Sequence, residues 1–218
     1  MCYNDCAMPR TFRFDLHLHS CLSPCADLDW SPRAIVERAL ELGLDALALT
    51  DHQSTLNCPA FAKCCAAAGL TSWFGLEICT REEVHLLALF DQLDPAMRFG
   101  EAFIRTLPAR ANRLDAFGEQ VVVEADDRVV GLEWRMLALA SSLPLEAAVE
   151  GAREAGALVV ASHVDRASYS VLSQLGFLTG KEGFDAVELS ARCPAPLPNG
   201  LDLAGYPVLR NSDAHMRE

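Results

Sequence analysis

Short, wholly apolar segments alternate along this chain with segments that carry helix signals, and this alternation restricts the fold more than any other feature. The segment 44–50 (LDALALT) is typical, because apolar residues fill almost all of it. Strands of this kind, separated by helices of about 10–15 residues, are typical of βα units around a mostly parallel sheet. Helix signals agree, since Ser31 and Pro32 open a predicted helix that Gly43 ends. The pattern therefore predicts a mostly parallel α/β fold.

The predicted strands are numerous enough for a barrel. We expect strands over 12–17, 44–50, 71–76, 84–90, 157–161, 185–189 and 206–209, and helices over 32–42, 58–68, 95–105 and 145–155. About six or seven strands can form a closed or nearly closed βα barrel, although 218 residues is short of the roughly 250 usual for eight units. Segment 91–144 breaks the rhythm, and its residues 120–124 and 128–130 predict a β-hairpin. We expect a single domain over residues 1–218, with about 91–144 as a small insertion over one face.

The charge and the termini restrict the partners. The chain has 30 acidic and 18 basic residues, a formal net charge of −12. Such a charge repels duplex DNA and anionic lipid, so we do not expect extended nucleic-acid binding or a membrane partner, whereas a small phosphorylated substrate is compatible. No run approaches the roughly 20 apolar residues of a membrane span, and residues 1–6 lack the features of a signal peptide. Nine scattered cysteines favour reduced thiols and a cytoplasmic location.

All six histidines stand at or beside the ends of predicted strands. They are His17, His19, His52, His85, His163 and His215. Strand ends converge on one mouth in parallel βα folds, and the i, i+2 spacing places His17 and His19 on the same face of their strand. A single such histidine is usually structural, but six of six is difficult to explain by independent structural roles. Mixed imidazole and carboxylate ligands suit Zn, Mn or Fe, so the pattern predicts a multinuclear metal site.

Six short motifs occur in an order that resembles the PHP (polymerase and histidinol phosphatase) family. They are Asp15-Leu16-His17-Leu18-His19-Ser20, Thr50-Asp51-His52, Gly75-Leu76-Glu77, Val84-His85, Ser162-His163 and Ser212-Asp213-Ala214-His215. The resemblance runs from about residue 12 to residue 215, and other strings in the chain are similar to an uncharacterised bacterial subgroup of the family. It implies a distorted (β/α)7 TIM-like barrel, the PHP fold, with the small insertion described above.

The resemblance also implies a trinuclear metal centre. His17, His19, Glu77 and Asp213 would hold a first ion, and Glu77 would bridge to a second ion held by His85 and His163. His52 and His215 would hold a third. Two to three divalent ions (Zn, Mn or Fe) would then hydrolyse phosphoesters through a bridging hydroxide. Asp213 is the candidate proton acceptor, and Asp51 would orient a ligand or act in proton transfer. Asp15 would interact with the metal ligands without binding the metal itself.

One position departs from the family pattern. Some members place a His or Asp about six residues after the second histidine of the first motif, and here that neighbourhood contains Cys25 and Asp27. Cys25 could ligate the third ion as a thiolate, which favours Zn or Fe over Mn, or it could be a packed thiol beside a weak third site. Asp27 is the less favoured alternative.

Two arginines are candidates for phosphate binding. Arg166 lies three positions after His163, just past a strand end, where its guanidinium could hold a phosphate in bidentate fashion. A salt bridge to Asp165 is the alternative role for it. Arg192, which follows the predicted strand 185–189, is the second candidate.

The preferred hypothesis is a metal-dependent phosphoesterase that acts on a small phosphomonoester or a nucleotide. The first alternative is a 3'-5' exonuclease-like phosphodiesterase, and the second is a catalytically silent metal-binding module, which should lack ligands. An amidohydrolase would want a bridging lysine, but Lys63 lies in a predicted helix and Lys181 in a predicted loop. The substrate, the native metal and the oligomeric state stay open.

Overall fold

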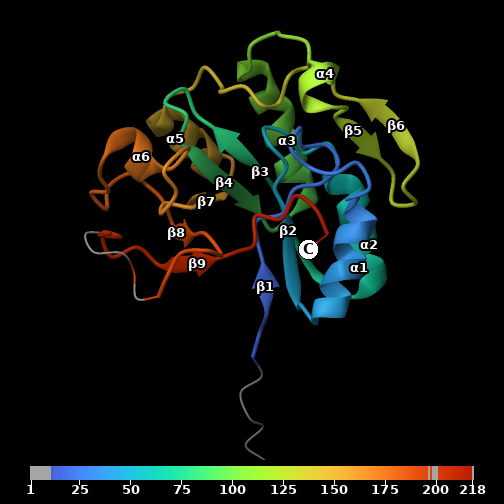
Figure 1. Ribbon diagram of the computed structural model, residues 1–218, viewed down its shortest axis with the longest axis horizontal. Coiled ribbons are helices and arrows are strands. Elements are labelled where there is room, and N and C mark those ends of the chain that lie inside the picture. Colours follow the sequence, from blue (N-terminus) through green and yellow to red (C-terminus); the bar gives the residue numbers. More distant parts are fainter. Residues whose placement is uncertain (1–10, 196, 198–200, 218) are drawn as a thin grey trace, which may run out of the picture.

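The computed structural model describes residues 11–195, 197 and 201–217, so the segment 1–6 considered above lies outside the described residues. Within these residues one sheet has seven strands in the order β1-β2-β3-β4-β7-β8-β9 (Figure 1). The strands are β1 (Phe14–Asp15), β2 (Ala46–Leu49), β3 (Thr71–Cys79), β4 (His85–Phe90), β7 (Leu158–Ala161), β8 (Ala186–Leu189) and β9 (Val208–Arg210). All seven overlap predicted strands, although β1 is only two residues long and leaves His17 beyond its end.

The sheet curls until its first and last strands meet. Beyond the end of β1, the amide of His19 donates to the carbonyl of Ala214 at 3.0 Å. The amide of Asp213 donates in the other direction to the carbonyl of His17, also at 3.0 Å. These bonds join the segments that follow β1 and β9, so the sheet is a nearly closed, distorted barrel, as predicted.

Strand β4 differs from the predicted parallel arrangement, because it runs antiparallel to both β3 and β7. The short connection between β3 and β4 explains this, since it closes as a tight turn in which the Thr80 amide donates to the Val84 carbonyl at 2.9 Å. A parallel neighbour would need a crossover of a dozen or more residues. Consequently His85, at the start of β4, lies at the same end of the barrel as the carboxyl ends of the other strands.

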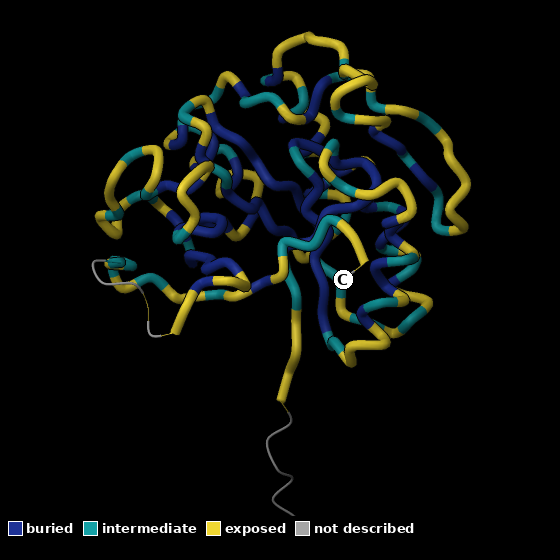
Figure 2. Tube along the Cα trace, viewed as in Figure 1, coloured by how far each residue is buried: buried dark blue, intermediate teal, exposed yellow. Residues whose placement is uncertain are grey.

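Two helices follow their sequence signals residue for residue. Helix α1 (Pro32–Leu42) begins where the Ser31 hydroxyl accepts from the amide of Ala34, and it ends at Gly43, whose φ of 66° is left-handed. Helix α2 (Cys58–Ala68) also begins and ends where predicted. With α3 (Leu93–Phe103) and α5 (Leu145–Glu154), these helices pack outside the barrel. Strands β2, β4, β7 and β8 are mostly buried, whereas the short strands β1 and β9 are partly exposed (Figure 2).

The segment between β4 and α5 has two parts. Helix α3 packs against β3 and β4, and the turn η1 (Ile104–Thr106) and the short helix α4 (Leu114–Phe117) follow it. Strands β5 (Val121–Val123) and β6 (Val129–Leu132) then form the predicted hairpin as a separate two-stranded sheet. Helix α6 (Val171–Leu175) was not predicted. Among the described residues, every helix is too short or too polar to cross a membrane.

Candidate metal centre

Glu77 lies at the middle of a cluster of imidazole rings in the mouth of the barrel. Its side chain, in β3, is 1% exposed. Five histidines place a ring nitrogen near one of its carboxylate oxygens: His17 at 3.3 Å, His19 at 3.4 Å, His52 at 3.1 Å, His85 at 3.1 Å and His163 at 3.3 Å. These histidines come from four different segments of the chain, one of which supplies both His17 and His19. The structure thus brings together the residues that the sequence placed at separate strand ends.

Asp213 faces the same cluster from the loop after β9. Its Oδ1 lies 3.3 Å from Nε2 of His17 and 3.2 Å from Nε2 of His19. Asp213 and His163 have φ values of 55° and 29°, which few residues other than glycine adopt. Strained backbone of this kind is concentrated at functional sites, where the surrounding structure holds it.

A third group of ligand atoms lies beside the first two. The rings of His52 and His215 flank that of His19, with centroid distances of 4.4 and 4.1 Å. Cys25, exposed at the mouth, has its thiol hydrogen-bonded to His215 and His52. Desolvation raises the pKa of this thiol, but those two hydrogen bonds outweigh it and lower the pKa to about 7. Among the described residues, neither Cys25 nor Asp27 belongs to the three candidate metal clusters.

The cluster has the chemistry of a cation site. Oε1 of Glu77 and Oδ1 of Asp213 are buried and form no hydrogen bond. In addition, Nε2 of His17 and Nε2 of His19 face each other at 3.1 Å. Buried polar atoms normally have partners, so acceptor atoms that converge without donors fit bound divalent ions. Three sets of ligand atoms are close enough to share an ion: His17, His19 and Glu77; His52, Glu77 and His85; and His19, His52 and His215.

In the metal-free cluster, neighbouring charged and hydrogen-bonding groups shift the pKa values of the candidate ligands. Burial would raise the pKa of Glu77, but His85 and His17 outweigh it and hold the pKa well below its usual range. Burial would lower the pKa of His52, but hydrogen bonds to Cys25 and Glu77 raise it to about 10. The pKa of His19 is lowered by burial and by the neighbouring His215 and His52. The free site therefore holds protons where ions would otherwise bind.

Glu188 is a site residue that the sequence reasoning missed. It is 1% exposed in β8, and both of its carboxylate oxygens lie 3.0 Å from Nδ1 of His17. It also accepts from the amide of His163 at 3.1 Å and from Nδ2 of Asn211 at 2.7 Å. A carboxylate on the far nitrogen of a histidine fixes the tautomer and aims the other nitrogen at the metal. A charged residue within an otherwise apolar strand was the available signal.

Asp51 lies behind the cluster. The amide and hydroxyl of Ser20 donate to its carboxylate at 2.6 and 2.7 Å, and the hydroxyl of Ser23 donates at 2.7 Å. Ser23 in turn lies 3.1 Å from Nδ1 of His19. The buried carboxylate therefore acts on the cluster through Ser23. Asp15 is placed similarly, since its Oδ1 accepts from the amides of His17 and Ser212.

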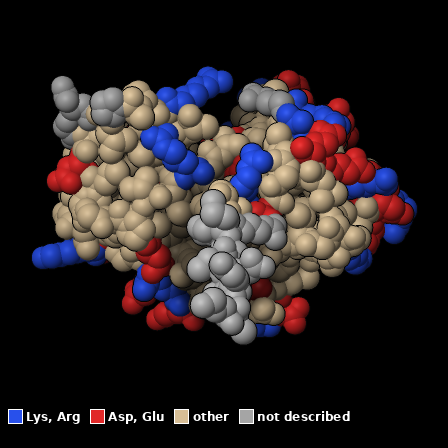
Figure 3. Space-filling model, turned by 90° about the horizontal axis from the view of Figure 1, so that it is seen from below, with Lys and Arg blue, Asp and Glu red and all other residues tan. Residues whose placement is uncertain are grey.

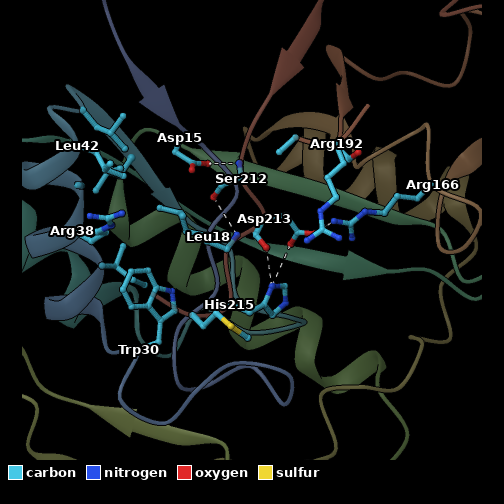
Figure 4. Close-up of a pocket in the computed structure, with 18 residues that line it drawn as sticks. Asp15, Leu18, Trp30, Arg38, Leu42, Arg166, Arg192, Ser212, Asp213 and His215 are labelled. Atoms are coloured by element: carbon cyan, nitrogen blue, oxygen red, sulfur yellow. Dashed lines mark hydrogen bonds and ion pairs between the residues drawn. The ribbon is translucent and has the colours of Figure 1, made fainter. Parts of the chain in front are cut away.

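Arg166 directly contacts Asp213 of the candidate metal cluster. Its Nη2 lies 2.7 Å from Oδ2 of Asp213, whereas Asp165 instead binds the amide and hydroxyl of Ser190. Arg166 and Arg192 line one cavity together with Asp213 (Figure 4). The two arginines named from the sequence thus lie beside the candidate metal ligands. Figure 3 shows basic and acidic side chains interspersed along the periphery of one face of the molecule.

Known proteins similar to this chain include phosphoesterases and nucleases. It is 36% identical over 91 residues to the 5'-3' exoribonuclease Rnm of Salmonella typhimurium. The aligned stretch is 39% of this chain and 30% of the exoribonuclease. A Bifidobacterium adolescentis protein assigned as a metal-dependent phosphoesterase has a similar structure, with a TM-score of 0.61, 21% identity, and coverage of 95% of this chain and 89% of that one.

The lesion-specific endonuclease PfuEndoQ of Pyrococcus furiosus shares the fold with a TM-score of 0.63 and 21% identity, over 94% of this chain and 48% of that one. At these identities the structural matches show the fold alone. The family model of the PHP domain matches residues 15–125, just over half of the chain. The chain therefore belongs to the PHP domain family.

Proposed function

We propose that this protein is a metal-dependent phosphoesterase that hydrolyses a small phosphomonoester or a nucleotide. The observation that carries the proposal is the convergence of five imidazoles and two carboxylates at the barrel mouth, next to the guanidinium of Arg166. PHP family membership supports a hydrolase acting on phosphoester bonds. The arginine supplies positive charge where a phosphoryl group would meet the metals.

Two to three divalent ions, Zn, Mn or Fe, would occupy the site. His17, His19, Glu77 and Asp213 would hold the first, Glu77, His85 and His163 the second, and His52 and His215 the third. Bound ions would activate a water molecule and neutralise phosphoryl oxygens. Cys25 would complete the third site as a thiolate, a role that its contacts with His52 and His215 support and that favours Zn or Fe.

The protein's own groups would orient the reactants and carry the proton. Burial raises the pKa of Asp213, but His17 and His19 outweigh it and lower the pKa well below its usual range, so the carboxylate stays deprotonated. Deprotonation is required both for binding metal and for accepting a proton from the attacking water. Arg166 fixes one oxygen of Asp213 and leaves the other toward the cluster. For Asp51 we propose orientation of His19 through Ser23 rather than proton transfer.

A nuclease that trims one end of a nucleic acid is the second candidate. The similarity to an exoribonuclease favours it, although that relative is named for 5'-3' polarity, opposite to the 3'-5' alternative considered from the sequence. The net charge of −12 weighs against a long nucleic-acid track but not against an end. The two functions share the metal centre and differ in the leaving group.

A substrate panel with a matched variant tests the proposal. Protein loaded with Zn, Mn or Fe would be assayed on phosphomonoesters, nucleotides, a phosphodiester and short RNA. We expect turnover that disappears with chelator and in Asp213→Asn, which keeps the size of the side chain and should keep the fold. Full turnover in Asp213→Asn would overturn the assigned role of Asp213, and no turnover with any loaded metal would favour the silent module.

A further inference from the structure

His85, the candidate ligand at the start of β4, lacks the hydrogen-bonded support that holds another ligand of the cluster. His17 has Glu188 on its far nitrogen, where both carboxylate oxygens lie 3.0 Å from Nδ1. His85 turns its Nδ1 toward Glu77 at 3.1 Å, and among the described residues no hydrogen bond reaches its other ring nitrogen. A histidine that binds metal normally has its second nitrogen fixed by a partner. The orientation of the His85 ring therefore depends on a contact of another kind.

Tyr169 contacts both the ring and the backbone of His85. The centroids of the two rings lie 4.7 Å apart, and their planes are tilted by 30°. The carbonyl of Tyr169 also accepts a hydrogen bond from the His85 amide at 2.8 Å. Aromatic rings at such distances attract each other beyond the effect of the area that they bury. One residue of the connection between β7 and α6 thus fixes the start of β4 and lies against the imidazole.

The backbone of Tyr169 is strained, and core packing does not account for the strain. Its φ of 56° is left-handed, a conformation in which a bulky side chain is a rare outlier. The side chain is 44% exposed, so burial of the ring offsets little of that cost. Next to it, the Ser170 hydroxyl donates to the carbonyl of Arg166 at 2.7 Å and closes the turn around Tyr169. Strain held in this way is typical of functional sites, and here it places the ring on His85.

We propose that Tyr169 is a positioning residue for the metal centre, whose ring holds the imidazole of His85 with Nδ1 directed at Glu77. The inference rests on the proposed function and deepens it, because His85 would bind the second ion there. Tyr169 would not touch the ion and would act through His85. Its hydroxyl has no hydrogen-bond partner among the described residues, so the aromatic ring, and not the phenol oxygen, carries the role.

Zinc binding by three variants tests this role. Tyr169→Phe keeps the ring and removes the hydroxyl, whereas Tyr169→Asn removes the ring and introduces a side chain that tolerates the left-handed conformation. Phe177→Asn, at a side chain 59% exposed beyond α6, is the matched control. The number and affinity of zinc ions per chain are measured by competition with a chromophoric chelator. We expect Tyr169→Asn to bind one of its ions about three- to tenfold more weakly, and Tyr169→Phe and the control to bind like wild type.

Urea midpoints of the metal-free proteins separate this role from a purely structural one. We expect the midpoint of Tyr169→Asn to stay near that of wild type, because relief of the strained φ offsets the lost ring contact. Zinc affinity in Tyr169→Asn equal to that of wild type would overturn the positioning role. An equal loss in Tyr169→Phe would overturn the assignment to the ring. Should Tyr169→Asn not fold, Tyr169→Leu keeps apolar bulk without the aromatic ring and should show the same weakening.

Failure of this inference is distinguishable from failure of the proposed function. If the wild-type protein binds several zinc ions but hydrolyses no phosphoester, the phosphoesterase is overturned, and weaker zinc binding in Tyr169→Asn still supports the positioning role. If the wild-type protein is active and Tyr169→Asn binds zinc as tightly as it does, the positioning role is overturned while the phosphoesterase stands.

Discussion

Glu188 holds Nδ1 of His17 with both carboxylate oxygens at 3.0 Å, so that Nε2 of the same ring is turned toward Glu77 and Asp213 at 3.3 Å. The pair links β8 to the loop after β1, across the seam of the barrel. Because the amide of His163 and the side chain of Asn211 also donate to Glu188, its carboxylate is fixed independently of the metal. These contacts orient the His17 ring from the side opposite its candidate metal-binding nitrogen.

Replacing Glu188 with Gln should weaken metal binding while the protein stays folded. The amide keeps the shape but loses the charge and one acceptor, so His17 is less well oriented and less basic. We expect metal affinity to fall about 10- to 100-fold, measured by competition with a chromophoric chelator. Glu101→Gln, at an exposed position, is the control. An unchanged affinity in Glu188→Gln would contradict the supporting role.

Metal binding should release protons near neutral pH. The pKa of His52 is raised to about 10 in the metal-free protein, so this ring is charged at pH 7, yet only the neutral ring can ligate. Apparent metal affinity should therefore rise as the pH increases toward 10. Calorimetry in buffers of different ionisation enthalpy should show fewer protons released from His52→Asn than from wild type. Equal proton release from the two proteins would contradict a role for charged His52 as a metal ligand.

The raised pKa of His52 also predicts how the stability of the metal-free fold depends on pH. A histidine whose folded pKa lies above its unfolded value of about 6.5 stabilises the fold fully below that value. The stabilisation is lost as the pH rises through the folded pKa, here about 10. Urea midpoints of the metal-free protein should fall between pH 7 and 10 more for wild type than for His52→Asn. Parallel curves for the two proteins would argue against a charged His52.

Cys25 should be the most reactive thiol of the described chain at pH 7. Its pKa is lowered to about 7, so about half is thiolate, whereas burial raises the pKa of Cys64, a half-buried thiol suited as the control. Alkylation by iodoacetamide, followed by mass spectrometry of the peptides, should modify Cys25 first, and bound metal should slow the reaction. Equal rates with and without metal would show that Cys25 is not a ligand.

Removing the guanidinium of Arg166 should impair turnover more than metal binding. Arg166→Gln loses the contact with Asp213 and the proposed phosphate-binding group, and hydrogen bonds to charged groups are worth about tenfold or more in kcat/KM. Metal content should remain near that of wild type, because Arg166 is not a ligand. If kcat/KM on a phosphomonoester were unchanged, Arg166 would be limited to a structural role.

Some features of the site were predictable because residue type and position both carry chemistry. His17 and His19 at i, i+2 at the end of a predicted strand, and four other histidines at strand ends, predict convergence without any coordinates. The role of Glu77 came from the family resemblance. Helix α1 was predicted in full because Ser31, Pro32 and Gly43 each act locally at its ends.

Other features depend on tertiary structure. Apolar patterning is the same for either direction of a strand, so it cannot show that β4 is antiparallel or that His85 begins its strand at the mouth. Glu188 becomes a site residue only because barrel closure brings β8 beside His17, 171 positions away. Helix α6, five residues long, has a capping box of Ser170 and Ser173 that lacks the usual acidic partner, so its signal is weak.

The central claim is that the cluster around Glu77 holds several metal ions. Elemental analysis of protein purified without chelator tests it most directly, with Glu77→Gln as the comparison because Glu77 is shared by two of the three ligand sets. We expect two to three ions of Zn, Mn or Fe per wild-type chain and a clear loss in the variant. One ion or none, in folded protein that cannot be reloaded, would contradict it.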